Sequence, residues 1–233
     1  MLTRLRRTAN DAWNLLKPAS GQQSFSQQGE DLVLRSLLEE ERIAMPNYVD
    51  IGSNDPVRLS NTYLFYSGGS QGLCVEPNPA YNLRYRRFRG RDRLLNVGVT
   101  AGSSGSLDYF EMDWPEFNTF DAAQAKEIER RYEGRNSIRR VSRKPILNIN
   151  ELLEQRANQT IDLLSLDVEG SDLGILGALD FSRFGPRFIC VEHTGTVTRG
   201  SEALSDSIQQ LLASKGYLMR AHNSINAIYQ RAG

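Results

Sequence analysis

Short apolar runs alternate with amphipathic stretches along most of the 233-residue chain. The apolar runs stop abruptly at polar residues, which is typical of buried parallel strands. Predicted strands cover residues 48–52, 72–76, 94–99, 161–167 and 188–192, with an extra strand at 106–111 and a terminal pair at 217–222 and 227–230. Predicted helices cover residues 61–66, 79–88, 172–179 and 201–215, and residues 146–154 lead into another. The alternation predicts an α/β fold with a doubly wound, mostly parallel sheet and a C-terminal antiparallel hairpin strand.

The domain organisation follows from where this alternation begins and where it is interrupted. Residues 1–23 are predicted to form a basic helix and a linker, and residues 24–233 a single domain. A polar segment at about 113–145 lacks the strand and helix patterns, so we interpret it as an insertion with a helical piece around 121–132.

The domain is expected to open with a helix whose start is marked by polar side chains. Ser26 is a suitable N-cap, and Glu30 and Asp31 fall in the first turns, where acids favour the helix dipole. Gly216 is suited to cap the last predicted helix.

Two of the predicted strands end at an acidic residue. Asp50 lies beside a turn at Gly52, and Glu76 ends the next strand, 26 residues after Asp50. A glycine turn lets backbone approach a ligand, and a carboxylate at the second strand tip can accept both hydroxyls of a ribose. This pair indicates a nucleoside-containing cofactor across the sheet edge.

A second set of acids follows the last two parallel strands. Asp167 and Glu169 follow one strand, and Glu192 and His193 the next, so their side chains should converge at the same edge. Clustered acids in an apolar cleft need compensation, either from a divalent cation or from a mixture of acid, base and hydrogen-bond partners. The alternative is that some of them only cap the helices that follow.

Bulk composition excludes few functions. Lys and Arg balance Asp and Glu at 28 each, so no overall field favours nucleic acid. Cys74 and Cys190 lie in apolar runs, as small buried residues of a reducing compartment would. No apolar run is long enough to span a bilayer, and residues 1–17 lack the apolar core of a signal peptide, so a cytoplasmic location is expected.

Basic and aromatic side chains gather in three places. They are Arg84, Arg86, Arg87, Arg89, Arg91 and Arg93; then Arg135, Arg139, Arg140, Arg143 and Lys144; and the aromatic residues Trp114, Phe117 and Phe120. The basic runs suit either a solvated surface or an anionic acceptor, and the second suits an exposed loop or a lid. The aromatic residues suit either sugar stacking or core packing.

Several short motifs recur together in one order along the chain. They are Ser26-Gln27-Gln28-Gly29-Glu30-Asp31, Val49-Asp50-Ile51-Gly52-Ser53-Asn54, Ser60-Asn61-Thr62, Val75-Glu76-Pro77-Asn78-Pro79, Asn118-Thr119-Phe120 and Leu166-Asp167-Val168-Glu169-Gly170. In this order they resemble the FkbM family of S-adenosylmethionine (SAM)-dependent methyltransferases. The resemblance implies a seven-stranded, Rossmann-like methyltransferase sheet and O-methylation of sugars in glycans, surface polysaccharides or natural products.

The resemblance also implies roles for residues at the strand ends. Asp50 and Gly52 would lie near the methionine part of SAM, Glu76 would hold the ribose, and Asn96 and Val97 would lie near the adenine. The full set of expected cofactor contacts is Asp50, Gly52, Ser53, Asn54, Glu76, Pro77, Asn78, Asn96 and Val97.

The acidic cluster is similar to that of metal-dependent O-methyltransferases of the catechol and macrocin types. By that resemblance Asp167, Glu192 and His193 would bind Mg²⁺ or Mn²⁺, and Glu169 would be the catalytic base. His193 could instead be the base, because its ordinary pKa suits neutral pH.

The leading hypothesis is therefore SAM-dependent methylation of a carbohydrate acceptor, with an anionic lipid or nucleotide carrier as one form of that acceptor. A nucleotide-binding oxidoreductase is the alternative, although no G-x-G-x-x-G follows Ile51. A non-catalytic adaptor with the same fold is a third class. The basic helix at residues 1–17 would contact either a second copy of the chain or a membrane surface.

Overall fold

The computed structural model describes residues 21–156, 159–168, 170–192 and 201–232, with backbone only for 201–203. The predicted basic helix at residues 1–17 lies outside the described residues. The strands of the main sheet are β1 (Tyr48–Ile51), β2 (Gly72–Val75), β3 (Arg93–Leu95), β7 (Leu163–Leu166), β8 (Phe188–Glu192), β9 (Tyr217–His222) and β10 (Asn226–Arg231). The strands of a smaller sheet are β4 (Gly98–Thr100), β5 (Gly105–Met112) and β6 (Ile138–Asn148).

The main sheet has seven strands in the order β3-β2-β1-β7-β8-β10-β9. The first five are parallel to one another, and β10 pairs antiparallel with both β8 and β9. This confirms the predicted α/β fold, the mostly parallel sheet and the closing antiparallel hairpin. The smaller sheet has the order β4-β6-β5, and β4 follows directly after β3 in the chain.

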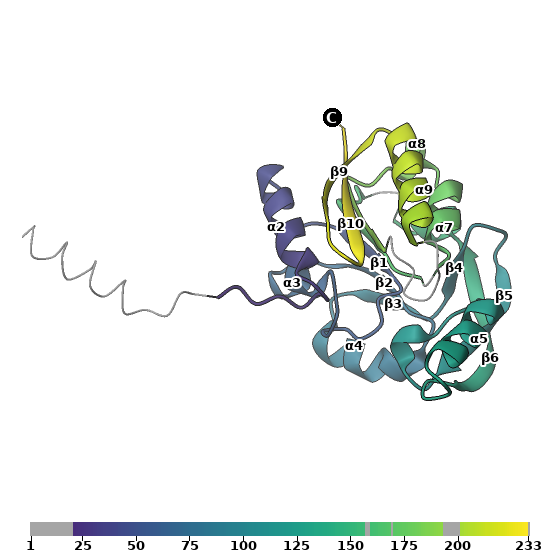
Figure 1. Ribbon diagram of the computed structural model, residues 1–233. Coiled ribbons are helices and arrows are strands. Elements are labelled where there is room, and N and C mark those ends of the chain that lie inside the picture. Colours follow the sequence, from purple (N-terminus) through teal and green to yellow (C-terminus); the bar gives the residue numbers. More distant parts are fainter. Residues whose placement is uncertain (1–20, 157–158, 169, 193–200, 233) are drawn as a thin grey trace, which may run out of the picture.

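Helices cover both faces of the main sheet (Figure 1). On one face lie α2 (Glu30–Glu40), α3 (Tyr63–Ser67) and α4 (Asn82–Phe88), which packs beside η1 (Pro79–Tyr81). On the other face lie α6 (Ile149–Glu154), α7 (Asp172–Ala178), α8 (Phe181–Phe184) and α9 (Ser201–Ser214). The short η2 (Pro115–Phe117) and α5 (Ala122–Arg131) belong to the smaller sheet, where α5 packs on β5 and β6. No helix in the described ranges is long and apolar enough to cross a bilayer.

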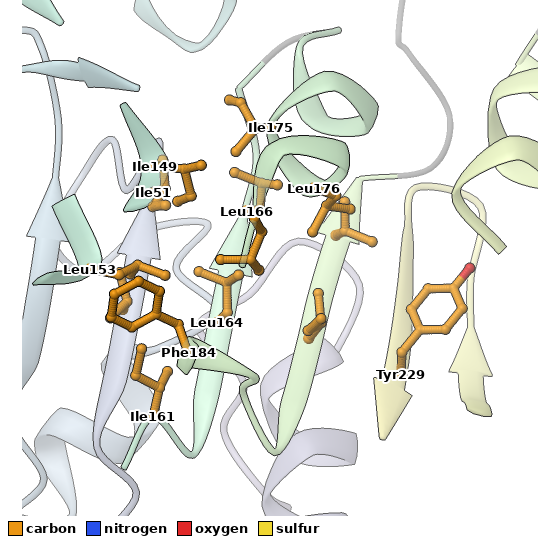
Figure 2. Close-up of a cluster of buried hydrophobic side chains, with 14 of the residues drawn as sticks. Ile51, Ile149, Leu153, Ile161, Leu164, Leu166, Ile175, Leu176, Phe184 and Tyr229 are labelled. Atoms are coloured by element: carbon orange, nitrogen blue, oxygen red, sulfur yellow. The ribbon is translucent and has the colours of Figure 1, made fainter. Parts of the chain in front are cut away.

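The larger hydrophobic core lies between the main sheet and helices α6–α9. Figure 2 shows Leu166 of β7 toward Ile175 of α7, and Leu164 of the same strand beside Phe184 of α8. Alternate residues of each strand face the second core, so both faces of the central strands are apolar and the runs read as continuous. Both cysteines are free and fully buried in this sheet.

The first helix starts later than predicted. Gly29 precedes α2 with φ of 89°, a left-handed conformation that cannot continue a helix backwards. The Ser26 hydroxyl accepts instead from the backbone N–H groups of Gly29 and Asp31, at 3.1 and 3.3 Å. Ser26 therefore orders a turn before the helix and is not its N-cap.

The predicted strand at 94–99 is wrong as a single element. It is divided between β3 of the main sheet and β4 of the smaller one. The Asn96 side chain lies at the break and donates to the Glu76 carbonyl at 2.9 Å and to the Asn82 side chain at 2.9 Å. These bonds turn the chain out of the main sheet.

The second basic run is also placed differently. Arg139, Arg140, Arg143 and Lys144 lie on β6, so they belong to a regular strand and not to a loop or lid. They come as two adjacent pairs, Arg139-Arg140 and Arg143-Lys144, so the period of a strand places one member of each pair on each face. The helical piece expected around 121–132 is confirmed as α5.

Candidate functional site

One large cavity opens at the carboxyl ends of the parallel strands. It has a volume of about 640 Å³ and is walled by β1, β2, β7 and β8 on one side and by β4, β5 and η2 on the other. Sequence-predicted residues that line it are Gly52, Asn54, Glu76, Pro77, Val97, Asp167 and Glu192. Such a crevice is where open α/β sheets bind their ligands.

Strand register places four of these residues side by side. Ile51 pairs with Val75 and with Leu166, and Leu166 pairs with Val191. The residues that follow, one from each strand end, therefore form a row. We name it the strand-end row: Glu76, Gly52, Asp167 and Glu192, continued on β10 by Asn226, which pairs with Glu192.

Gly52 is required by the closeness of its neighbours in this row. Its φ is 78°, and a Cβ at this position would collide with the Asp167 carbonyl. Its backbone N–H donates to the Val75 carbonyl at 3.0 Å. A glycine here therefore lets the ends of β1 and β7 approach each other closely at the floor of the cavity.

Glu76 is the best-defined side chain of the cavity. It is 5% exposed, and its two carboxylate oxygens accept from the backbone N–H groups of Asn54 and Asn78 at 3.0 and 2.7 Å. Burial raises the pKa of Glu76 to about 7, although the two N–H donors oppose the shift. Each oxygen retains a lone pair for a hydroxyl of a ligand.

Three predicted cofactor residues do not line the cavity but support it. Asn96 fixes the end of β3, as described above, and Asn78 caps η1 by accepting from the Ala80 N–H at 3.0 Å. Ser53 is buried, and its hydroxyl accepts from the Tyr85 hydroxyl at 2.8 Å. A direct contact of these residues with a cofactor stays a prediction.

Asp50 also lies away from the cavity, because successive residues of a strand face opposite sides of the sheet. Its carboxylate accepts from the Thr62 hydroxyl at 2.5 Å and lies 3.8 Å from the Arg89 guanidinium. Arg89 is 1% exposed and forms a second ion pair with Asp92 at 2.6 Å. Burial raises the pKa of Asp50, and Arg89 opposes that rise. In this structure Asp50 belongs to a buried ionic network.

Asp167 and Glu192 end adjacent strands and both line the cavity, as predicted. Burial, and then the negative charges of Asp50 and Glu30, raise the pKa of Asp167. Glu169 and His193 lie outside the described residues. Among the residues that are described, no three His, Cys, Asp or Glu side chains are grouped to hold a metal ion, so the cation finds no support here.

Asp172 is a carboxyl group that the sequence analysis passed over. It is 2% exposed in the first turn of α7 and accepts from the Val168 N–H at 3.3 Å. Burial, and next the negative charge of Asp167, raise its pKa to about 7. The sequence does carry a signal for Asp172. It follows Asp167 by five residues, and Gly170 between them allows a turn that returns the chain to the same edge of the sheet.

The aromatic residues divide between the cavity and its support. Phe117 and Phe120 line the cavity together with Tyr109. Trp114 is not among the lining residues; it packs edge-on against Tyr132 at 5.0 Å and against Phe117 at 6.1 Å between ring centroids. The cavity therefore has an aromatic wall, contributed by β5, by η2 and by the segment after η2.

The charged side chains that line the cavity, within the described residues, are all acidic. They are Glu76, Glu116, Asp121, Asp167 and Glu192. The arginines lie elsewhere: Arg89 is buried in its network, and Arg143 pairs with Asp108 on β5 at 3.4 Å. The Lys144 ammonium lies 5.9 Å from the centre of the ring of Tyr109, which lines the cavity.

Solved structures with similar overall folds are distant in sequence. A TehB-like SAM-dependent methyltransferase from Corynebacterium glutamicum is 9% identical over 100% of both chains, with a TM-score of 0.45. An O-methyltransferase from Bacillus cereus in complex with S-adenosylhomocysteine (SAH) is 12% identical over 95% of this chain and 86% of that chain, also with a TM-score of 0.45. Similarity this low carries no information about substrate or residue roles.

Family membership comes from the sequence itself. No curated protein matches the chain significantly. The methyltransferase FkbM domain matches residues 50–219, which run from within β1 into β9 and include every member of the strand-end row except Asn226. This range is well over half of the chain and confirms the family that the motifs indicated. The chain belongs to the FkbM family of methyltransferases.

Proposed function

We propose that the protein transfers the methyl group of SAM to a hydroxyl group of a carbohydrate. The observation that best supports SAM as the cofactor is Glu76. It is a buried carboxylate at the tip of β2 inside the cavity, with lone pairs left for two hydroxyls of a ligand. Gly52 supports it, because it lines the cavity together with Asp167 and presents only backbone to the methionyl part.

The charge of the cavity is consistent with this ligand. SAM, when bound, supplies a methyl group already activated as a sulfonium cation. The acidic lining attracts a cation and, within the described residues, offers no basic side chain to an anion. We therefore expect the reacting part of the acceptor to be a neutral hydroxyl, with any phosphate of a lipid or nucleotide carrier kept outside the cavity.

The chain itself must position the acceptor and remove its proton. The aromatic wall of Tyr109, Phe117 and Phe120 offers flat apolar surface for one face of a sugar ring. Asp167 ends β7 in the middle of the strand-end row, where a carboxylate can accept the hydroxyl proton. Glu169 and His193 remain candidates for the same role on sequence grounds.

Calorimetry with SAH and with NAD tests the cofactor. We expect SAH to bind to the wild-type protein and NAD not to bind. NAD binding without SAH binding would favour the oxidoreductase, and binding of neither would favour the adaptor. Analysis of products from glycan acceptors tests the second half of the proposal, because a methyl ether on sugar is expected and methylation confined to protein, nucleic acid or small phenols would contradict it.

The divalent cation needs its own experiment. If Asp167, Glu192 and His193 bind a metal, a chelator should abolish turnover while SAH binding survives, and Mg²⁺ or Mn²⁺ should restore it. If His193 is the base and no metal is used, the chelator should have no effect, and His193→Ala should reduce the rate by about 10²–10⁴.

A further inference from the structure

The motif at residues 26–31 joins the far end of the chain at the edge of the cavity. Glu30 is buried, and one of its oxygens accepts from the side-chain amides of Asn223 and Asn226, at 2.9 and 2.8 Å. Gln28 and Ser224 exchange two hydrogen bonds, at 2.7 and 2.9 Å. We name this pairing of residues 26–31 with the turn at 223–226 the clasp.

The clasp is rigid on its N-terminal side. The second oxygen of Glu30 accepts from the Gln28 N–H at 2.8 Å. Asp31 is also buried, and it accepts from the Ser26 hydroxyl at 2.9 Å and from the Phe25 N–H at 2.7 Å. Burial opposes ionisation of Glu30, but the donors from Asn226, Gln28 and Asn223 outweigh it and hold the pKa of Glu30 below its ordinary value. Both acids of the segment are thus held by several hydrogen bonds each.

Two side chains of the clasp line the cavity, Gln27 and Ile225. Gln27 is exposed, and its amide forms no hydrogen bond with any part of the chain that the structure describes. Its neighbour Gln28 points instead to Ser224. Two adjacent glutamines therefore differ: one closes the clasp and the other faces the cavity.

The clasp lies at the opposite end of the strand-end row from Glu76. Asn226 is four strand positions from Glu76, which at about 4.8 Å for each pair of strands amounts to roughly 19 Å. A cofactor whose ribose is held at β2 would cross β1 and β7 with its methionyl chain. The space beside β8 and β10, where Gln27 lies, is then left for the acceptor.

Given methyl transfer to a sugar hydroxyl, as proposed above, we infer that Gln27 binds the acceptor and that the clasp holds it in place. A primary amide both donates and accepts, which matches a sugar hydroxyl, and it carries no charge that would select an anion. Glu30 is a positioning residue that acts through Gln27. The motif at 26–31 thereby gains a role in substrate binding, although it precedes the matched family range.

Adjacent glutamines provide a matched test. SAH-saturated protein is titrated with the methyl glycosides of glucose, galactose, mannose and rhamnose, and binding is followed by saturation-transfer NMR. Gln27→Ala should weaken the binding of glycosides that the wild type binds by about tenfold, as expected for one or two lost hydrogen bonds. Gln28→Ala removes only the exposed bonds to Ser224 and keeps those of Glu30 to Asn223 and Asn226, so it should weaken glycoside binding less than threefold. Both variants should bind SAH within twofold of wild type.

A double variant separates positioning from general damage. If Glu30 acts through Gln27, Glu30→Ala should weaken glycoside binding on its own but add nothing to Gln27→Ala. Asn223→Ala is a milder break of the same clasp that leaves Asn226 bonded, and it should show the same non-additivity. Additive losses would overturn the positioning role.

The remaining outcomes distinguish this role from the proposed function. Glycoside binding by Gln27→Ala equal to wild type overturns the role of Gln27 and leaves the methyl transfer standing. Weaker SAH binding by Gln27→Ala would make Gln27 a cofactor residue and would also overturn it. Wild-type protein that binds SAH but none of the glycosides contradicts the sugar acceptor and the role of Gln27 together.

Discussion

Buried carboxyl groups lie on both faces of the main sheet, and their charges are balanced in different ways. On the face covered by α4, Arg89 forms ion pairs with Asp50 and Asp92. Its guanidinium carbon lies 5.3 and 5.8 Å from the ring centroids of Tyr48 and Tyr85. The network is closed within the protein. It holds β1, α3 and α4 together without any ligand.

At the cavity the balance is incomplete. Within the described residues no Lys or Arg forms an ion pair with Glu76, Asp167 or Asp172, and burial raises the pKa of each. Such unbalanced carboxyl groups destabilise the folded protein, and a cationic ligand would relieve them. One set of buried acids is therefore neutralised within the fold, whereas the other is not, and on the proposed function a cationic ligand would complete its balance.

The largest effect is expected from opening the closed network. Arg89→Met should lower the free energy of unfolding by about 3–5 kcal/mol, because Asp50 and Asp92 would stay buried without a counter-charge. Arg86→Ala, on the exposed part of the same helix, should change it by less than about 0.5 kcal/mol. Denaturant unfolding measures both, and equal effects would show that Arg89 is not the centre of the network.

Substitutions at the cavity should affect the binding of SAH. Glu76→Ala should weaken SAH binding by about 2–4 kcal/mol, because two charge-assisted hydrogen bonds to the ribose are lost. Calorimetry measures this directly. Unchanged SAH affinity would mean that Glu76 does not hold the ribose, and the contrast between the two faces would lose its functional meaning.

The same carboxyl group should give the cavity a pH signature. Glu76 binds its proton more tightly when the protein is folded, so stability is lost as pH rises from its ordinary pKa of 4.5 through the folded value of about 7. Between pH 5 and 8 the ligand-free protein should lose on the order of 2 kcal/mol from this group. Glu76→Gln should flatten the profile by that amount, and a profile identical to wild type would contradict the raised pKa.

The smallest effect is expected at the rim of the cavity. Asp121 is exposed and accepts from the N–H groups of Ala123 and Gln124 at the start of α5, at 2.7 and 3.2 Å. Asp121→Ala should cost about 1 kcal/mol of stability through loss of the cap and should leave SAH binding unchanged. Asp121→Asn keeps the acceptor oxygen and is the control. A large loss of SAH affinity would assign Asp121 to the binding face.

Much of the fold could be predicted because the central strands have a distinct sequence pattern. They are short apolar runs with acids at their carboxyl ends, and their order placed Glu76, Asp167 and Glu192 at one edge. The division of the predicted strand at Asn96 could not be predicted from the spacing of apolar residues, because it depends on hydrogen bonds from the Asn96 side chain to residues earlier in the chain.

The role of Arg89 shows where sequence reasoning stops. It belongs to a run of arginines that suited a solvated surface or an anionic acceptor, and nothing in the run marks one member as buried. Its partners Asp50, Thr62 and Tyr48 come from other elements and meet it only in the folded protein. Likewise Asp50 looked like a cavity residue by position, but its place in the strand turns it to the other face.

The clasp has a consequence for the order in which the site can be made. Gln28 and Ser224 are 196 residues apart, among the longest-range contacts in the domain. During synthesis β1, β2 and β7, which would bind the cofactor on the proposed function, emerge first, whereas the segment that carries Gln27 gains its partner only when the β9–β10 hairpin leaves the ribosome. A nascent chain that lacks this hairpin would therefore have an incomplete pocket, in which the side proposed for the acceptor is finished after the side proposed for the cofactor.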